Sequence, residues 1–140
     1  MSQTKTVIIT GAGSGIGEAA ARRFSADGWN VVLNGRTKEK LDKVAGDLPG
    51  ERTLVVSGDV SNANDVSHLV SQTVDRFGGI DCLVNNAGVM TPPTRKITAD
   101  GFELQFGTNY LGHFALTAHL LPLLKRGRDP RVVTVSSIAA

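Results

Sequence analysis

Short apolar runs alternate along the chain with longer segments in which apolar residues recur at helical spacing. The short runs are rich in β-branched residues and predict strands at 6–10, 30–34, 53–57, 80–84 and 131–136. The longer segments predict helices at 15–27, 38–48, 63–77 and 101–126. The pattern therefore predicts a regular succession of strands and helices.

This succession favours a parallel sheet, because its strands are apolar throughout and must be covered on both faces. Right-handed crossovers then give a doubly wound α/β sheet of the Rossmann type, with three αβα layers and strand order 3-2-1-4-5. No repeat, low-complexity tract or linker divides the sequence. We therefore expect a single domain over residues 1–140.

Individual residues mark several boundaries. Gly28 predicts the end of the first helix, Asn62 predicts the N-cap of the third, and Gly78 predicts its end. The segment 90–100 predicts a long loop. Pro122 falls inside the last helical pattern and predicts a kink or a break there.

Composition excludes several classes of function. The formal net charge is +2 and no long basic run occurs, so nucleic-acid binding is not indicated. No apolar stretch reaches the length of a membrane span, and no secretory signal pattern is present. The single cysteine, Cys82, lies in an apolar run and predicts a core residue in a cytoplasmic protein. The histidines do not have metal-ligand spacing: His68, His113 and His119.

The turn after the first strand carries the strongest functional signal. Glycine occupies every second position of this turn: Gly11, Gly13, Gly15 and Gly17. A strand, a tight turn and a helix N-terminus leave backbone N–H groups available for a pyrophosphate. We expect Ser14 and Ile16 to present such N–H groups. The turn therefore predicts nucleotide binding, with a nicotinamide dinucleotide as the first candidate.

The wider motif set resembles the short-chain dehydrogenase/reductase family. Thr10, Gly11, Gly15 and Gly17 are similar to its TGxxxGxG turn, and Ile16 stands where the common dinucleotide fingerprint has glycine. Further matching motifs follow in family order: Asp59-Val60, Asn85-Asn86-Ala87-Gly88, Asn109 and Ser136-Ser137. The resemblance covers the whole chain. It implies that the chain binds NAD(H) or NADP(H). It also implies that the full-length relatives transfer hydride between nicotinamide and a carbonyl or alcohol.

The resemblance also implies roles for residues around the coenzyme. Asp59 corresponds to the residue that bonds the adenine amino group, and Val60 packs nearby; a turn or cap aspartate is the alternative reading of Asp59. Ala87 and Gly88 correspond to residues that line the coenzyme. Asn86, also in the coenzyme region, corresponds mainly to a residue that ties adjacent strands together.

The end of the second strand bears on coenzyme choice. An aspartate at this point would bond the adenosine ribose hydroxyls and repel a 2′-phosphate. Here Gly35 and Arg36 follow Asn34, and a guanidinium can bind a phosphate in bidentate fashion. The sequence therefore predicts a preference for NADP(H), with NAD(H) possible. The alternative reading of Arg36 is a surface residue beside the next helix.

In catalysis the resemblance implies a set of Asn, Ser, Tyr and Lys that handles the substrate proton. Asn109 and Ser137 match the first two. The Tyr-x-x-x-Lys pair has no counterpart, since the single tyrosine is Tyr110 and Phe114 stands four residues later. We therefore expect a domain truncated after the fifth strand, with negligible turnover. A carbonyl or alcohol substrate would react only if the domain were completed.

A glycine-rich turn after the first strand also fits other functions. The chain could be a non-catalytic nucleotide-binding module, or an engineered or shortened fragment. A methyltransferase also has a glycine-rich turn after its first strand, but it needs an acidic residue where Gly35 and Arg36 stand. Self-association is expected through the edge of the fifth strand or the helix at 101–126, because both would lack neighbours.

Overall fold

The computed structural model describes residues 3–88, 93–98 and 101–136. Within them, five parallel strands form one sheet in the order β3-β2-β1-β4-β5. The strands are β1 (Thr6–Ile9), β2 (Asn30–Gly35), β3 (Thr53–Ser57), β4 (Cys82–Asn85) and β5 (Arg131–Thr134). The predicted α/β class and strand order are confirmed.

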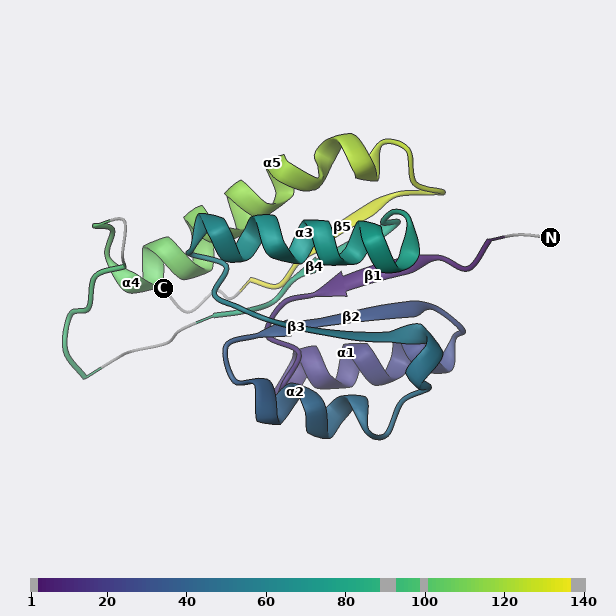
Figure 1. Cartoon of the computed structure of the whole chain (residues 1–140). Coiled ribbons are helices and arrows are strands. Elements are labelled where there is room, and N and C mark those ends of the chain that lie inside the picture. Colours follow the sequence, from purple (N-terminus) through teal and green to yellow (C-terminus); the bar gives the residue numbers. More distant parts are fainter. Residues whose placement is uncertain (1–2, 89–92, 99–100, 137–140) are drawn as a thin grey trace.

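Helices cover both faces of the sheet (Figure 1). One face carries α1 (Gly15–Ala26) and α2 (Lys38–Ala45). The other face carries α3 (Ala63–Phe77) and α5 (His113–Leu124). Shorter elements complete the described chain: η1 (Gly50–Arg52), α4 (Leu104–Phe106) and the π-helical η2 (Gly107–Gly112). The three-layer αβα arrangement is thus confirmed.

Alternate residues of β1 explain why its sequence is apolar at every position. Ile8 packs in a cluster with Leu69 of α3 and with α5, whereas Val7 and Ile9 pack in a second cluster with Leu41 of α2 and with α1. All five of these side chains are fully or almost fully buried. Burying a large aliphatic side chain stabilises a fold by about 1.5–3 kcal/mol, so both helical layers hold the central strand in place.

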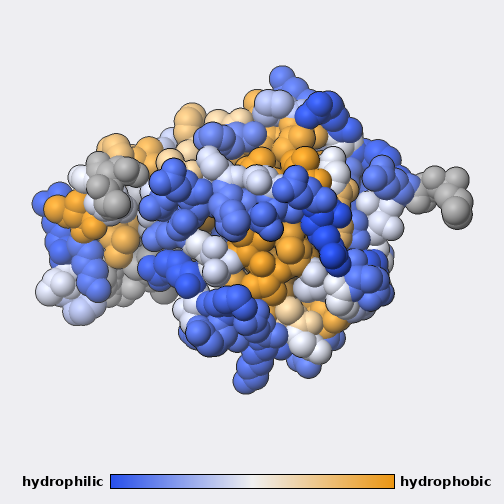
Figure 2. Space-filling model, viewed as in Figure 1, coloured by the Kyte–Doolittle hydropathy of each residue, from blue (hydrophilic) through white to orange (hydrophobic). Residues whose placement is uncertain are grey.

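The outer surface shows the same division between buried apolar and exposed polar side chains. In Figure 2 the hydrophilic side of α3 crosses the front of the molecule, and apolar surface emerges beneath it where β3 forms the sheet edge. Leu54 and Val55 of β3 are half-buried. The amphipathic pattern of α3 therefore buries its apolar side on the sheet and leaves its polar side outward.

Three predicted boundaries are confirmed by backbone geometry. Gly28 follows α1 with a φ of 89°, and Gly78 follows α3 with a φ of 81°, in the left-handed region that glycine adopts at helix ends. Asn62 caps α3 through its side-chain oxygen, which accepts hydrogen bonds from the N–H groups of Asn64 and Asp65. The α3 boundaries match the predicted range 63–77.

The predicted single helix at 101–126 is wrong. Helical structure begins only at Leu104, where the Glu103 side chain accepts from two backbone N–H groups, and η2 then interrupts the α-helical pattern. At the end of η2, a Cβ on Gly112 would lie 2.6 Å from the carbonyl oxygen of Val60. This contact requires glycine. Apolar spacing does not register the one residue that a π turn adds.

Of the kink or break predicted at Pro122, the break is wrong, because α5 continues to Leu124; the kink stays a prediction. Pro122 lies in the last turn, so its missing N–H removes a bond only near the end of the helix. The predicted strand at 53–57 matches β3, as the helix at 63–77 matches α3, and the remaining predicted elements differ from the observed ones by one to three residues at an end. The predicted loop at 90–100 lies partly outside the described residues. Ser137 lies wholly outside them.

Cys82 occupies the core as predicted, with 3% of its surface exposed. Burial raises the pKa of its thiol, and the nearby Asp81 adds to the effect. Among the described residues, no group of histidine, cysteine or acidic side chains is arranged to hold a metal ion. None of the described helices combines the length and the apolar character that crossing a membrane requires.

Candidate coenzyme-binding site

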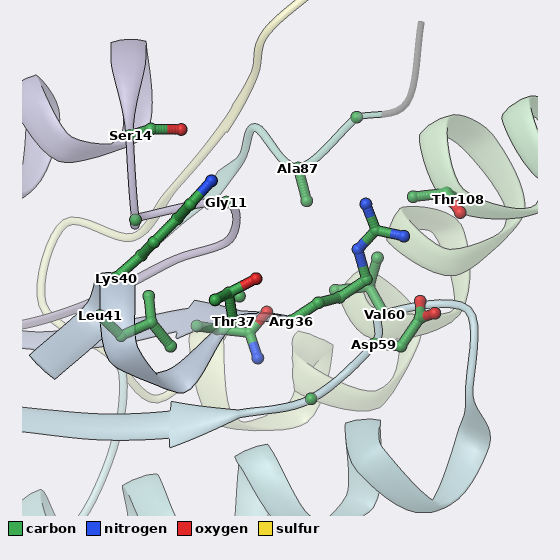
Figure 3. Close-up of a pocket in the computed structure, with 15 residues that line it drawn as sticks. Gly11, Ser14, Arg36, Thr37, Lys40, Leu41, Asp59, Val60, Ala87 and Thr108 are labelled. Carbon is green, nitrogen blue, oxygen red and sulfur yellow. The ribbon is translucent and has the colours of Figure 1, made fainter. Parts of the chain in front are cut away.

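A cleft lies at the carboxyl ends of β1, β2, β3 and β4 (Figure 3). Chain order reverses between β1 and β4, and ligands of open α/β sheets bind at such a switch point. Eight residues predicted to contact a coenzyme line the cleft: Gly11, Gly13, Ser14, Arg36, Asp59, Val60, Ala87 and Gly88.

The glycine-rich turn forms one wall. Gly11 has a φ of 63°, and a Cβ there would lie 2.8 Å from the Cα of Ala87, so the two backbones pack directly against each other. The helix α1 begins at Gly15, and the first N–H groups of a helix have no partner within it. Ser14, at the N-cap position, makes no side-chain cap. This wall therefore offers backbone donors and the positive end of the α1 dipole to an anion.

Some predicted residues of the turn do not line the cleft. Gly15, Ile16 and Gly17 are absent from its lining, and the Ile16 side chain is 63% exposed. The missing side chain of Gly17 has a packing role instead, since a Cβ there would overlap the carbonyl oxygen of Gly11. Only the backbone N–H groups of these residues remain candidates for phosphate contacts.

Asn86 lies behind the wall rather than in the cleft lining. Its side-chain nitrogen donates to the carbonyl oxygens of Thr10 and Gly11, at 3.2 and 3.3 Å. The N–H groups of Asn86 and Ala87 both donate to the Thr10 hydroxyl, each at 2.9 Å. These bonds join the ends of β1 and β4, as expected for Asn86. Thr10 is the centre of the junction, a role that sequence reasoning missed.

Two cations enter the cleft from the segment after β2. In Figure 3 the Arg36 guanidinium extends toward the side that carries Thr108, and the Lys40 ammonium extends toward Gly11 and Ser14. Neither cation takes part in an ion pair within the part of the chain that the structure describes. Lys40 was missed; the available signal is its place in the first turn of the helix that follows Arg36.

Asp59 lines the cleft and also organises the turn after β3. Its Oδ1 accepts hydrogen bonds from the N–H group and the hydroxyl of Ser61, at 2.9 and 2.7 Å. The Asp59 N–H in turn donates to Asp65. The turn role and a ligand role are compatible, because only one oxygen of the carboxylate, Oδ1, bonds Ser61 and the residue also lines the cleft.

Two buried polar atoms in the cleft lining have no hydrogen-bond partner among the described residues. They are the Oδ1 atom of Asn34 and the hydroxyl oxygen of Thr108, whose residue is only 4% exposed. Buried polar atoms are normally paired, so both atoms are candidates for a hydrogen bond with a bound ligand or water. Thr108 was missed; its place directly before Asn109 is the only signal in the sequence.

Asn109 lies in η2 beside the cleft rather than in its lining. A Cβ on Gly88 would be 3.4 Å from the side-chain oxygen of Asn109, so the two residues are close neighbours. The backbone carbonyl of Asn109 bonds His113 Nδ1 at 3.3 Å. Burial lowers the pKa of His113, against a smaller opposing effect of this bond. Ser137 lies outside the described residues, so its juxtaposition with Asn109 stays a prediction.

The chain belongs to the short-chain dehydrogenase family, whose model matches residues 5–140. It is 41% identical over 139 residues to retinol dehydrogenase 13 of Mus musculus, an alignment that covers 96% of this chain and 41% of that protein. It is 40% identical over 136 residues to L-fucose dehydrogenase of Bos taurus, covering 96% and 49%. Both relatives are dehydrogenases by name.

A solved structure supports the same assignment. The 3-ketoacyl-(acyl-carrier-protein) reductase of Brucella melitensis, complexed with NADH, matches with a TM-score of 0.85 and 35% identity. The match covers 96% of this chain and 57% of that one. The chain thus spans about half the length of the curated relatives and solved structures that it matches.

Proposed function

We propose that this chain forms the coenzyme-binding part of an NADP(H)-dependent oxidoreductase that acts on a carbonyl or alcohol. The observation that carries the proposal is the cleft lined by Gly11, Arg36, Asp59 and Ala87. It combines the start of α1, two cations and two orphaned polar atoms in one site. These groups match the diphosphate, the ribose phosphate and the base of a dinucleotide.

Each part of the coenzyme has candidate partners in the cleft. The N–H groups at the start of α1, near Ser14 and Ile16, would hold the diphosphate. Asp59 and the Thr108 hydroxyl would bond the edge of the adenine ring, with Val60 packed beside it. This assignment gives the orphaned Thr108 oxygen a partner.

The choice of NADP(H) over NAD(H) rests on charge at the end of β2. Gly35 supplies no carboxylate, and Arg36 and Lys40 lie in the cleft outside any ion pair of the described residues. A 2′-phosphate would gain charge-assisted hydrogen bonds from these two side chains. A ribose hydroxyl would leave both cations without an anionic partner, so NAD(H) is expected to bind more weakly.

The bound coenzyme supplies or accepts the hydride. In the proposed reaction Asn109 organises the proton relay beside the nicotinamide end of the cleft, and Ser137 orients the substrate oxygen. The sequence contains no Tyr-x-x-x-Lys pair to transfer the proton. We therefore propose that the 140-residue chain binds coenzyme without appreciable turnover.

Calorimetric titration of the 140-residue chain with NADPH, NADH and S-adenosylmethionine tests the function directly. We expect NADPH to bind most tightly and NADH to bind measurably. Tightest binding of S-adenosylmethionine would instead indicate a methyltransferase. Binding of none of the three would overturn the proposal, and rapid NADPH oxidation with a carbonyl substrate would overturn its statement on turnover.

Self-association is a second proposal, favoured by exposed aromatic side chains. Phe106, Tyr110 and Phe114 stack in a row along α4, η2 and α5, with ring centroids 5.4 and 6.4 Å apart. Their exposed fractions are 49%, 58% and 67%. Such a row, like the exposed valines of β5, favours burial against a second copy. Light scattering after gel filtration tests this: a dimer or larger species is expected, and a monomer contradicts it.

A further inference from the structure

His113, the first residue of α5, is buried, with 6% of its surface exposed. Its Nε2 lies 3.0 Å from the hydroxyl oxygen of Thr10, and its Nδ1 lies 3.3 Å from the carbonyl oxygen of Asn109. Residues 10 and 109 are far apart in the sequence. The imidazole therefore joins the end of β1 to the π-helical turn η2.

The donors around the Thr10 hydroxyl fix the direction of the two hydrogen bonds of His113. A hydroxyl has two lone pairs and one proton. The N–H groups of Asn86 and Ala87 both donate to this oxygen at 2.9 Å and use its lone pairs. The Thr10 hydroxyl can then only donate its proton.

Two acceptors compete for that proton. The carbonyl oxygen of Val84 lies 3.4 Å away and already accepts the Thr10 N–H, whereas His113 Nε2 lies at 3.0 Å. The shorter distance and the vacant lone pair favour the histidine. Nε2 is therefore an acceptor, and the neutral ring carries its hydrogen on Nδ1, which donates to Asn109. Burial lowers the pKa of His113, in agreement with a neutral ring.

The result is a directed chain of hydrogen bonds from the Ala87 N–H through Thr10 and His113 to the Asn109 carbonyl. Bonds aligned in one direction polarise and strengthen each other. The chain links three segments that bound the proposed coenzyme site: the start of the glycine-rich turn, the segment after β4, and η2 with Thr108 and Asn109.

We infer that His113 is a positioning residue, which holds η2 in register against the strand ends that form the coenzyme cleft. The inference rests on the proposed function. Without the imidazole, η2 loses its hydrogen bond to Thr10, so Thr108 and Asn109 are held less firmly beside Ala87 and Gly88. The coenzyme must then order η2 as it binds, and this ordering lowers its affinity.

Three variants separate the two bonds of the ring. In H113Q the side-chain oxygen reaches the position of Nε2 and can accept the Thr10 hydroxyl. In H113N the side-chain amide reaches the position of Nδ1 only, and in H113F neither bond forms. H119Q is the matched control, because His119 lies on the exposed side of the same helix.

NADPH titrations of the 140-residue chain and these variants give the first readout. We expect H113F and H113N to bind NADPH about 5- to 30-fold more weakly. H113Q should lose no more than about threefold, and H119Q should match the unmodified chain. Equal affinity of all three His113 variants and the unmodified chain would overturn the inference, and so would an H113Q loss as large as that of H113F.

Nitrogen-15 NMR of the imidazole gives a second readout that does not depend on coenzyme or on variants that fold. At neutral pH we expect His113 to show a protonated Nδ1 and an unprotonated Nε2. The opposite tautomer or a charged ring would overturn the inference. Failure of the unmodified chain to bind NADPH, with the expected tautomer present, would instead refute the proposed function.

Discussion

Gly17 packs directly on the carbonyl group of Gly11, and a Cβ built on Gly17 would overlap that oxygen. The same Cβ would lie 2.7 Å from the side-chain nitrogen of Asn86. The first turn of α1 therefore sits against the end of β1 only because residue 17 has no side chain. This contact places the N-terminus of α1 at the wall of the cleft.

The substitution Gly17→Ala should displace α1 or the Gly11 carbonyl. We expect it to lower the free energy of unfolding by about 1–3 kcal/mol, the usual cost of overpacking, and to weaken NADPH binding. Denaturant melts and coenzyme titrations measure both effects. Gly46→Ala is the control, because its Cβ would make ordinary 3.5 Å contacts in a helical backbone. Equal stability of G17A and the unmodified chain would contradict the packing argument.

Arg36→Gln and Lys40→Gln should each weaken NADPH binding about 10- to 100-fold, because each removes a charged partner of the 2′-phosphate. NADH has no such phosphate, so its affinity should change little. Lys38→Gln is the matched control: Lys38 lies on the same helix but pairs with Asp42 on the surface. Parallel losses for NADPH and NADH would show that the two side chains do not select the phosphate.

Thr108→Val should have opposite effects on stability and binding. The orphaned hydroxyl is removed, so the free chain should gain about 1 kcal/mol in unfolding free energy. The adenine ring loses a hydrogen-bond partner, so NADPH affinity should fall about fivefold. Thr108→Ser keeps the hydroxyl and serves as the control. A T108V variant that is no more stable, yet binds NADPH as before, would remove Thr108 from the site.

Stability should depend on pH through His113. Its folded-state pKa lies below the ordinary value of 6.5, because burial disfavours the charged ring. The unfolded chain therefore binds a proton first as pH falls. The stability that the neutral ring contributes is fully present above pH 6.5 and is lost as pH decreases from 6.5 through the folded-state pKa. Urea melts between pH 8 and pH 5 should show this loss, and H113Q should lack this component. An identical pH dependence in H113Q would contradict the assignment.

Much of the fold could be predicted because the strands are continuous apolar runs with turn residues between them. Right-handed crossovers then leave few strand orders, and the observed one was expected. The π-helical η2 could not be predicted, since inserting one residue into a helix leaves its apolar spacing almost unchanged. The glycine at residue 112 has its reason in Val60, which is distant in the sequence.

The site was predictable where a local motif carries the function. The wall at Gly11 and the cation at Arg36 follow from their neighbours in the sequence. Lys40 and Thr108 were missed because a lysine on a helix and a threonine in an apolar segment are both common at positions without function. Only the tertiary structure aims Lys40 into the cleft and leaves the Thr108 hydroxyl unpaired.

Backbone amide NMR during an NADPH titration tests the central claim most directly, since that claim places the diphosphate on the N–H groups at the start of α1. The account predicts that the largest shifts fall on the amides of residues 13–17, with further shifts near Arg36 and Thr108. An NADPH titration that leaves the amides of residues 13–17 unmoved would contradict it.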